Sequence, residues 1–146
     1  MIATTVSQSK KLLELGLSPE SADMIYTHKT VFYNMMENRL YVDEDDDWHL
    51  HQRSEIAFMD TGNEIFAWSL GALLDVMPMI ECERGPYRPM FGKFIMNRNY
   101  YCDYSNDCQE GIKIILSDTP IEAAYSMVVW LLENGFIKKE PKTSSE

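Results

Sequence analysis

The sequence lacks the motifs that identify several large classes of enzymes and membrane proteins. It contains no glycine-rich phosphate-binding loop, no G-x-S-x-G nucleophile elbow and no H-E-x-x-H zinc motif. No apolar run approaches the roughly 18 residues of a membrane span, and residues 1–5 have neither the basic nor the apolar region of a signal peptide. We therefore expect a soluble, cytoplasmic protein, favour a non-catalytic one and expect no cofactor.

Cysteine and positive charge are both scarce. The three cysteines, Cys82, Cys102 and Cys108, form neither a C-x-x-C pair nor a four-ligand zinc set, so we interpret them as buried or incidental thiols in a reducing compartment. Lysine and arginine number 13 against 23 aspartates and glutamates, a formal net charge of −10. This charge argues against a general nucleic-acid or anionic-membrane binder and is compatible with a basic protein partner.

The length and composition are those of one globular domain. A chain of 146 residues can bury a self-sufficient core, and 45% hydrophobic with 25% charged residues is ordinary for a soluble protein. We predict a single domain over residues 1–139. Residues 140–146 are polar, and we predict a mobile tail there.

The clearest predicted element is a helix over residues 119–135. Thr119 suits the N-cap, Pro120 the first helical position and Glu122 a capping box, while Asn134-Gly135 supplies a stop. Polar side chains form only one narrow stripe on this helix, so most of its circumference must be covered. We expect it to be the core helix.

Helical signals also occur in the first half of the chain. Residues 7–15 predict a short helix that ends at Gly16, and Ser18-Pro19 predicts the start of another that continues to Tyr26. Residues 64–77 carry apolar side chains at helical spacing and predict a second amphipathic helix that ends before Pro78. Residues 31–36 and 48–58 fit either helix or strand.

The pattern changes to strands after Pro78. Residues 91–96, 100–105 and 112–116 predict an antiparallel meander with turns at 97–99 and 105–111. Helices followed by a meander and a closing helix indicate an α+β fold. We expect the small meander to pack against the C-terminal core helix, with the 64–77 helix beside it.

The first functional hypothesis is a protein-binding surface in the acidic segment 37–64, which holds nine acidic and two basic residues. An acidic surface can steer a basic partner, and it can mimic the phosphates of a nucleic acid. A solvated loop is the ordinary alternative. The candidate binding residues are the acidic run and the tryptophan that follows it: Asp43, Glu44, Asp45, Asp46, Asp47 and Trp48.

A second hypothesis is a single-stranded nucleic-acid binder. Residues 84–104 interleave basic and aromatic side chains, a combination that can stack bases and contact phosphates. The alternative is an ordinary amphipathic meander with aromatic side chains inward and bases outward. The candidate contacts are Arg84, Arg88, Lys93, Arg98 and Tyr100.

A third hypothesis is a metal-dependent hydrolase. His49 and His51 follow the acidic run as D-D-D-x-H-x-H, and two histidines at this spacing share one face of a strand. A carboxylate, and His28 as a third nitrogen ligand, can complete a site for Zn²⁺ or another divalent ion. The acidic run alone does not match a calcium-binding EF-hand.

Three segments carry a resemblance to a known group of proteins: SKKLLELGLSPESADM (9–24), IFAWSLGALLDVMP (65–78) and DTPIEAAYSMVVWLLENGFIKK (118–139). Together they cover about a third of the chain. They resemble short, uncharacterised proteins of phages and mobile elements of gut anaerobes, with one departure at Phe66, where that group has proline. The resemblance implies a phage or mobile-element accessory protein and assigns no activity and no catalytic residues.

Overall fold

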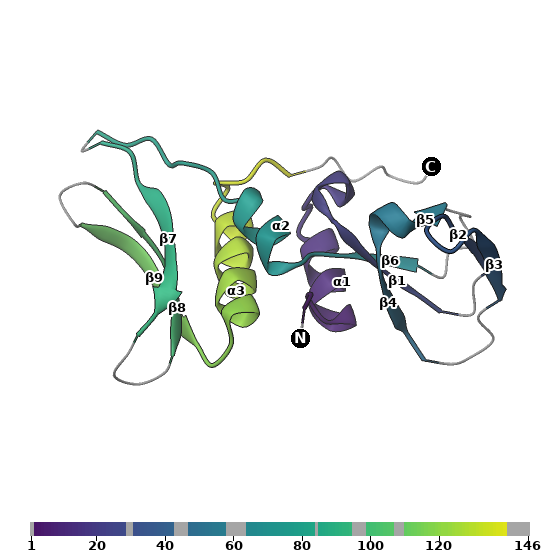
Figure 1. Ribbon diagram of the computed structural model, residues 1–146. Helices are drawn as coiled ribbons and strands as arrows, with labels where there is room; N and C mark the ends of the chain where they lie inside the picture. The colour runs from purple at the N-terminus through teal and green to yellow at the C-terminus, as the bar shows by residue number, and fades with distance from the viewer. Residues whose placement is uncertain are drawn as a thin grey trace.

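The chain folds into helices and small antiparallel sheets, which confirms the predicted α+β class. The computed structural model describes residues 2–28, 31–42, 47–57, 64–83, 85–94, 99–106 and 110–139. Its described strands form three three-stranded sheets with the orders β4-β1-β6, β3-β2-β5 and β7-β8-β9. The first two sheets lie at one end of the molecule, the helices in the middle and the third sheet at the other end (Figure 1).

The described elements have the following bounds. The helices are α1 (Val6–Glu14), α2 (Leu70–Asp75) and α3 (Pro120–Glu133), with single 3₁₀ turns η1 (Pro19–Ser21) and η2 (Arg53–Glu55). The strands are β1 (Met24–Thr27), β2 (Val31–Asn34), β3 (Arg39–Val42), β4 (His49–Gln52), β5 (Ile56–Ala57), β6 (Glu64–Ala67), β7 (Arg88–Lys93), β8 (Tyr100–Ser105) and β9 (Gly111–Ser117).

Helix α3 is the predicted core helix. Thr119 Oγ1 accepts a hydrogen bond from Glu122 N (3.2 Å), and Gly135 has φ = 76° directly after the helix end. The Glu122 carboxylate accepts from Ser117 Oγ (3.2 Å) rather than closing the predicted capping box. Half of the α3 residues are buried: Ile121, Ala123, Ala124, Met127, Val128, Leu131 and Leu132.

The predicted meander is confirmed as strands β7, β8 and β9. Cys102 in β8 is paired with Phe91 in β7 and Ile115 in β9, and these three side chains belong to the core that includes α3. The first strand begins at Arg88, three residues before its predicted start. α2 lies beside α3, as expected of the second amphipathic helix (Figure 1).

The predicted helix over residues 64–77 is wrong in its first half. Residues Glu64–Ala67 form strand β6, which pairs with β1, and Ser69 then caps the short helix α2 by accepting a hydrogen bond from Ala72 N (3.2 Å). The apolar spacing is compatible with a helix, but pairing with β1 satisfies the backbone of this segment and overrides the local pattern.

The predicted helix from Ser18-Pro19 to Tyr26 is also wrong. The Ser18-Pro19 pair starts only the 3₁₀ turn η1, and the chain then enters β1, the central strand between β4 and β6. Met24, Ile25 and Thr27 are buried in β1. A central strand has its backbone paired on both sides, which a helical turn at this place cannot match.

Helix α1 agrees with its prediction and has a start signal that was missed. Thr5 and Gln8 form a complete capping box, with Gln8 N donating to Thr5 Oγ1 (3.1 Å) and Thr5 N to Gln8 Oε1 (3.0 Å). Leu12 is fully buried, and Gly16 has φ = 97° as the helix stop. An alanine at position 16 would be strained by this φ and would also place its Cβ 2.9 Å from Lys139 Cβ.

The two segments that fitted either helix or strand are mainly strands in their described parts, since residues 31–34 form β2, 49–52 form β4 and 56–57 form β5, with the 3₁₀ turn η2 at 53–55. Several predictions fall outside the described residues. These are most of the acidic loop at 43–47, the turn at 61–63, most of the turn at 97–99, the centre of the turn at 105–111 and the tail at 140–146.

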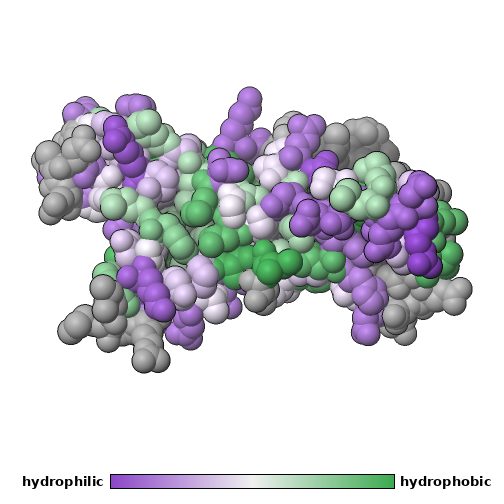
Figure 2. Space-filling model, viewed as in Figure 1, coloured by the Kyte–Doolittle hydropathy of each residue, from purple (hydrophilic) through white to green (hydrophobic). Residues whose placement is uncertain are grey.

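Trp68 joins the two halves of the structure. Its indole Nε1 donates to Ser21 Oγ (2.9 Å), its backbone N donates to Thr4 Oγ1 (3.1 Å), and its carbonyl accepts from Thr4 N (2.9 Å). Trp68 is fully buried in the main core, while its neighbour Ala67 belongs to the smaller core of the β1 sheet. Figure 2 shows hydrophobic residues gathered over the middle of the molecule, where the helices lie.

Candidate functional site

The outer face of the β7–β8–β9 sheet is the candidate functional site. α3 covers one face of this sheet, and no described segment covers the other (Figure 1). This uncovered face, called the outer face below, carries five large apolar side chains that are substantially exposed: Met90 (52%), Phe94 (39%), Ile112 (39%), Ile114 (53%) and Leu116 (51%).

Strand alternation explains why these side chains point away from α3. Side chains of directly paired residues share a face, so Cys102, with Phe91 and Ile115, defines the face toward α3. The neighbouring positions Met90, Asp103 and Ile114 are paired with one another and therefore lie together on the outer face. In β9 the outer positions are apolar at Ile112, Ile114 and Leu116, whereas Ile115 is the apolar residue of this strand on the α3 side.

Gly92 allows an aromatic surface to form at one end of the outer face. Tyr101 is paired with Gly92, and a Cβ at position 92 would lie only 2.7–2.9 Å from the Tyr101 ring atoms. The Tyr101 ring therefore lies across Gly92, with its centroid 4.7 Å from that of the Phe94 ring. A side chain at position 92 would force this ring away from the sheet.

Asp103 is the acidic side chain at the centre of the outer face. Its Oδ1 atom is buried and has no hydrogen-bond partner in the described structure. Beside it is a cavity of about 330 Å³ lined by Asp103, Gly111, Ile112, Lys113 and Ile114. The Lys113 ammonium group does not neutralise Asp103, since it lies 5.9 Å from the Trp130 ring centroid, on the α3 side of the sheet.

A larger cavity of about 810 Å³ lies around Arg53, at the junction of η1, β1, β4 and α2. Arg53 Nη1 donates to the carbonyls of Pro19 (2.8 Å) and Ala22 (3.2 Å), and its guanidinium carbon lies 4.6 Å from the Phe66 ring centroid. Asp23 accepts hydrogen bonds from Ser69 N (2.8 Å) and Ser69 Oγ. These groups hold neighbouring segments together, which gives them a structural role.

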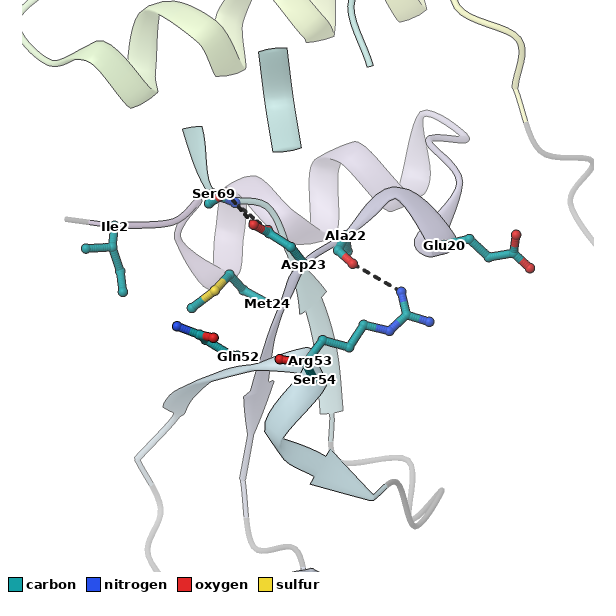
Figure 3. Close-up of a pocket in the computed structure, with 9 residues that line it drawn as sticks. All are labelled: Ile2, Glu20, Ala22, Asp23, Met24, Gln52, Arg53, Ser54 and Ser69. Atoms are coloured by element: carbon teal, nitrogen blue, oxygen red, sulfur yellow. Dashed lines mark hydrogen bonds between the residues drawn. The ribbon is translucent and has the colours of Figure 1, made fainter. Parts of the chain in front are cut away.

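Figure 3 shows the arrangement of this cavity. The Arg53 side chain extends toward Ala22 and Asp23 reaches Ser69, while the Glu20 carboxylate points away from both. The ionic groups therefore do not converge on one point of the cavity. A ligand here would find the Arg53 and Asp23 groups already bonded to protein atoms, so we do not choose it as the site.

Only part of the predicted acidic surface can be placed. Residues 43–46 lie outside the described part of the chain, whereas Asp47 is exposed and Trp48 is half-buried. The Trp48 ring packs against His28 with 4.8 Å between ring centroids. Asp47 and Trp48 directly precede β4, at the end of the molecule opposite the outer face (Figure 1). The described part of the predicted acidic surface, Asp47 and Trp48, is thus separate from the outer face.

The predicted nucleic-acid contacts are divided between the two faces of the meander. Arg84 and Arg98 lie outside the described residues. Arg88 is exposed on the outer face, whereas Lys93 is on the α3 side, with its Nζ 5.3 Å from the centroid of the Tyr100 ring. The described contacts do not form one continuous surface, and nucleic-acid binding stays a prediction.

The two predicted metal ligands lie on one face of β4, as their spacing requires. His51 Nε2 forms a hydrogen bond with Thr27 Oγ1 (3.1 Å), and His49 is paired with Thr27 in the register. Among the described residues, no group of three or more His, Cys, Asp and Glu side chains is placed to hold a metal ion. Cys82 is exposed, Cys102 is buried, and Cys108 is outside the described chain.

Comparisons with known protein families, with curated proteins and with solved structures find no match to this chain. No helix in the described part is long and apolar enough to cross a membrane.

The outer face and Asp103 were not predicted from the sequence. The signal was present in GIKIILS, because Ile112, Ile114 and Leu116 alternate along one face of the strand while Ile115 is an apolar residue on the other face. A meander with only one covering helix leaves one of those faces uncovered. Which face is uncovered depends on packing against α3, which the strand pattern alone does not reveal.

Proposed function

We propose that this protein is a non-catalytic binding protein that contacts another protein through the outer face. The single observation that carries this proposal is the set of five large apolar side chains, 39–53% exposed, on one face of a three-stranded sheet. An antiparallel sheet with one covered face ordinarily presents polar side chains on the other. Contiguous exposed apolar surface is typical of protein interaction sites.

The composition and the rigidity of the outer face also suit a protein partner. Phe94 and Tyr101 supply aromatic contact area at one end, and aromatic residues and methionine are enriched in interface cores. Strand pairing holds Met90, Ile114 and Leu116 on a rigid framework, so binding requires little ordering of the backbone.

The charge of the chain favours a basic partner. A formal net charge of −10, with much of it in residues 37–64, attracts a positively charged protein over long range and speeds its association. An accessory role in a phage or mobile element, which the sequence resemblance implies, fits a protein of this kind and stays a hypothesis.

The test compares capture of cellular proteins by three forms of the chain. The first is wild type, and the second carries Ile114→Thr with Leu116→Thr, which removes apolar surface while placing threonine, a residue that suits strands, at both positions. The third carries Leu40→Thr with Val42→Thr. This is a matched control in β3, because the side chains at both positions are more than half exposed in wild type. Circular dichroism and thermal unfolding first establish that all three forms are folded.

We expect a partner that binds wild type and the β3 control with the same affinity. Its affinity for the Ile114→Thr, Leu116→Thr variant should be lower by at least about tenfold. Equal affinity of the partner for all three forms would show that binding uses another surface. The proposal would then be wrong.

A further inference from the structure

The carboxylate of Asp103 has an unsatisfied hydrogen-bond acceptor on the outer face. Its Oδ1 atom is buried without a donor among the described residues, between the paired positions Met90 and Ile114. A buried acceptor that lacks a partner costs free energy, and the cost is larger for a charged group. An incoming donor would remove that cost as it binds.

The sheet itself does not provide a cation for this group. Lys113 is one of the residues that line the cavity, but its ammonium group lies over Trp130 on the opposite face. Arg88 is on the outer face, yet forms no ion pair with Asp103 in the described structure. No cation in the part of the chain that the structure describes pairs with the negative charge at the centre of the outer face, so a ligand's cation can do so.

The cavity beside Asp103 has the size and lining that a basic side chain requires. Its volume is about 330 Å³, and its walls include the apolar side chains of Ile112 and Ile114. Lysine and arginine bury their aliphatic stems against apolar surface while the charged end reaches a carboxylate. Gly111 lines the cavity without a side chain, and a Cβ there would meet only Tyr104 O, at 3.6 Å.

From these observations we propose that the partner inserts one lysine or arginine side chain, flanked by apolar residues, into the cavity beside Asp103. This inference rests on the proposed function of the outer face and names the chemistry of the partner. The carboxylate gives specificity for a basic residue, and Ile114, Leu116 and Met90 contact its apolar neighbours. The partner is a protein segment with a basic anchor at the centre of an apolar surface.

A second copy of this chain is a poorer occupant. Two molecules that each carry a net charge of −10 repel one another, and the only described cation on the outer face is Arg88. A partner with its own basic residue gains from the charge at Asp103 without that repulsion.

Random dodecapeptides displayed on phage provide a probe that does not require the natural partner. The library is panned on the wild-type protein after removal of peptides that bind the Ile114→Thr, Leu116→Thr variant. We expect the enriched peptides to carry a lysine or arginine next to apolar residues. Synthetic peptides should bind Asp103→Asn with roughly tenfold or more weaker affinity, since the loss is that of a hydrogen bond to a charged group.

Three controls make this measurement specific. Asp103→Glu keeps the charge and should retain more affinity than Asp103→Asn. Gly111→Val fills the cavity without changing charge and should also weaken binding. Replacing the peptide's lysine with norleucine should abolish the difference between wild type and Asp103→Asn, which is the coupling expected of a direct contact.

The outcomes separate the two proposals. Peptides without basic residues, or equal affinity for wild type and Asp103→Asn, would overturn the basic anchor, while loss on the Ile114→Thr, Leu116→Thr variant would still support the outer face as a binding site. If no peptide distinguishes wild type from that variant, both proposals fail. A concentration-dependent dimer that the same variant dissociates would overturn the basic partner in favour of a second copy.

Discussion

Cys102 and Tyr104 are buried titratable side chains on the α3 side of β8. Burial, with a smaller contribution from the neighbouring Asp103 carboxylate, raises the pKa of the Cys102 thiol from 9.0 to about 12. Burial, followed by the charge that Cys102 would carry, also raises the pKa of the Tyr104 hydroxyl well above its ordinary 10.0. Tyr104 donates its hydroxyl proton to the Pro78 carbonyl (2.9 Å). The fold therefore requires both groups to stay protonated.

These raised pKa values predict a loss of stability in alkali. Above about pH 9 the unfolded chain releases the Cys102 proton that the folded chain retains, so the free energy of unfolding falls as pH rises toward 12. Below pH 9 both states keep the proton and this effect is absent. Urea unfolding between pH 7 and 11 should show a shallower decline for Cys102→Ala than for wild type. Parallel declines would contradict this assignment, whatever stability the variant loses at neutral pH.

Single residues also show where sequence reasoning succeeds. Thr119, Pro120 and Gly135 act through neighbours in sequence, so their roles at the ends of α3 were predicted. Asp103 is unlike them, because its role depends on which face of β8 is covered and on side chains from two other strands. The sequence shows that residue 103 is acidic, but it does not show which side chains surround it.

Helices and strands show the same distinction between local and distant causes. α1 and α3 were predicted because their caps and apolar spacing lie within each segment. β1 and β6 were mistaken for helices because what makes them strands is their pairing with one another, more than 35 residues apart in sequence. The meander was predicted because its strands are neighbours along the chain.

At the scale of elements, α3 should dominate stability. Leu131 is fully buried, and Leu131→Ala should lower the free energy of unfolding by about 2–5 kcal/mol, through lost burial and the cavity that remains. Glu133→Ala is a matched control at an exposed position of the same helix and should change it by no more than about 0.5 kcal/mol. Urea unfolding at neutral pH measures both, and similar values for the two variants would show that α3 is not the core helix. Removing residues from Pro120 onward should unfold the protein.

At the scale of the whole molecule, different sheets lie at the two ends, and the helices lie between them (Figure 1). Trp68 is hydrogen-bonded to Thr4 and Ser21 and packs in the main core with α2 and α3. Because Trp68 directly follows β6 in the chain, disruption of the main core should also disturb the sheet that contains β1 and β6. The prediction of one domain over residues 1–139 requires such a coupling between the two ends.

Native-state hydrogen exchange tests that prediction at the scale of the whole chain. Amides in the two central strands, β1 (Met24–Thr27) and β8 (Tyr100–Ser105), should have the same free energy of opening and the same dependence on denaturant. Mass spectrometry of peptic peptides, or NMR, resolves both strands. A lower opening energy for β1 alone would show that the two ends unfold as separate units, and the single-domain prediction would be wrong.

The exposed outer face also affects the solubility of the protein. At neutral pH and low ionic strength, mutual repulsion between molecules of net charge −10 keeps these apolar faces apart. Salt shortens the range of that repulsion to about 8 Å at 0.15 M ionic strength, and acid removes it by protonating carboxylates. The same sheet that suits a partner thus makes the unpartnered protein prone to precipitate in salty or acidic solution, and well suited to purification on a hydrophobic column.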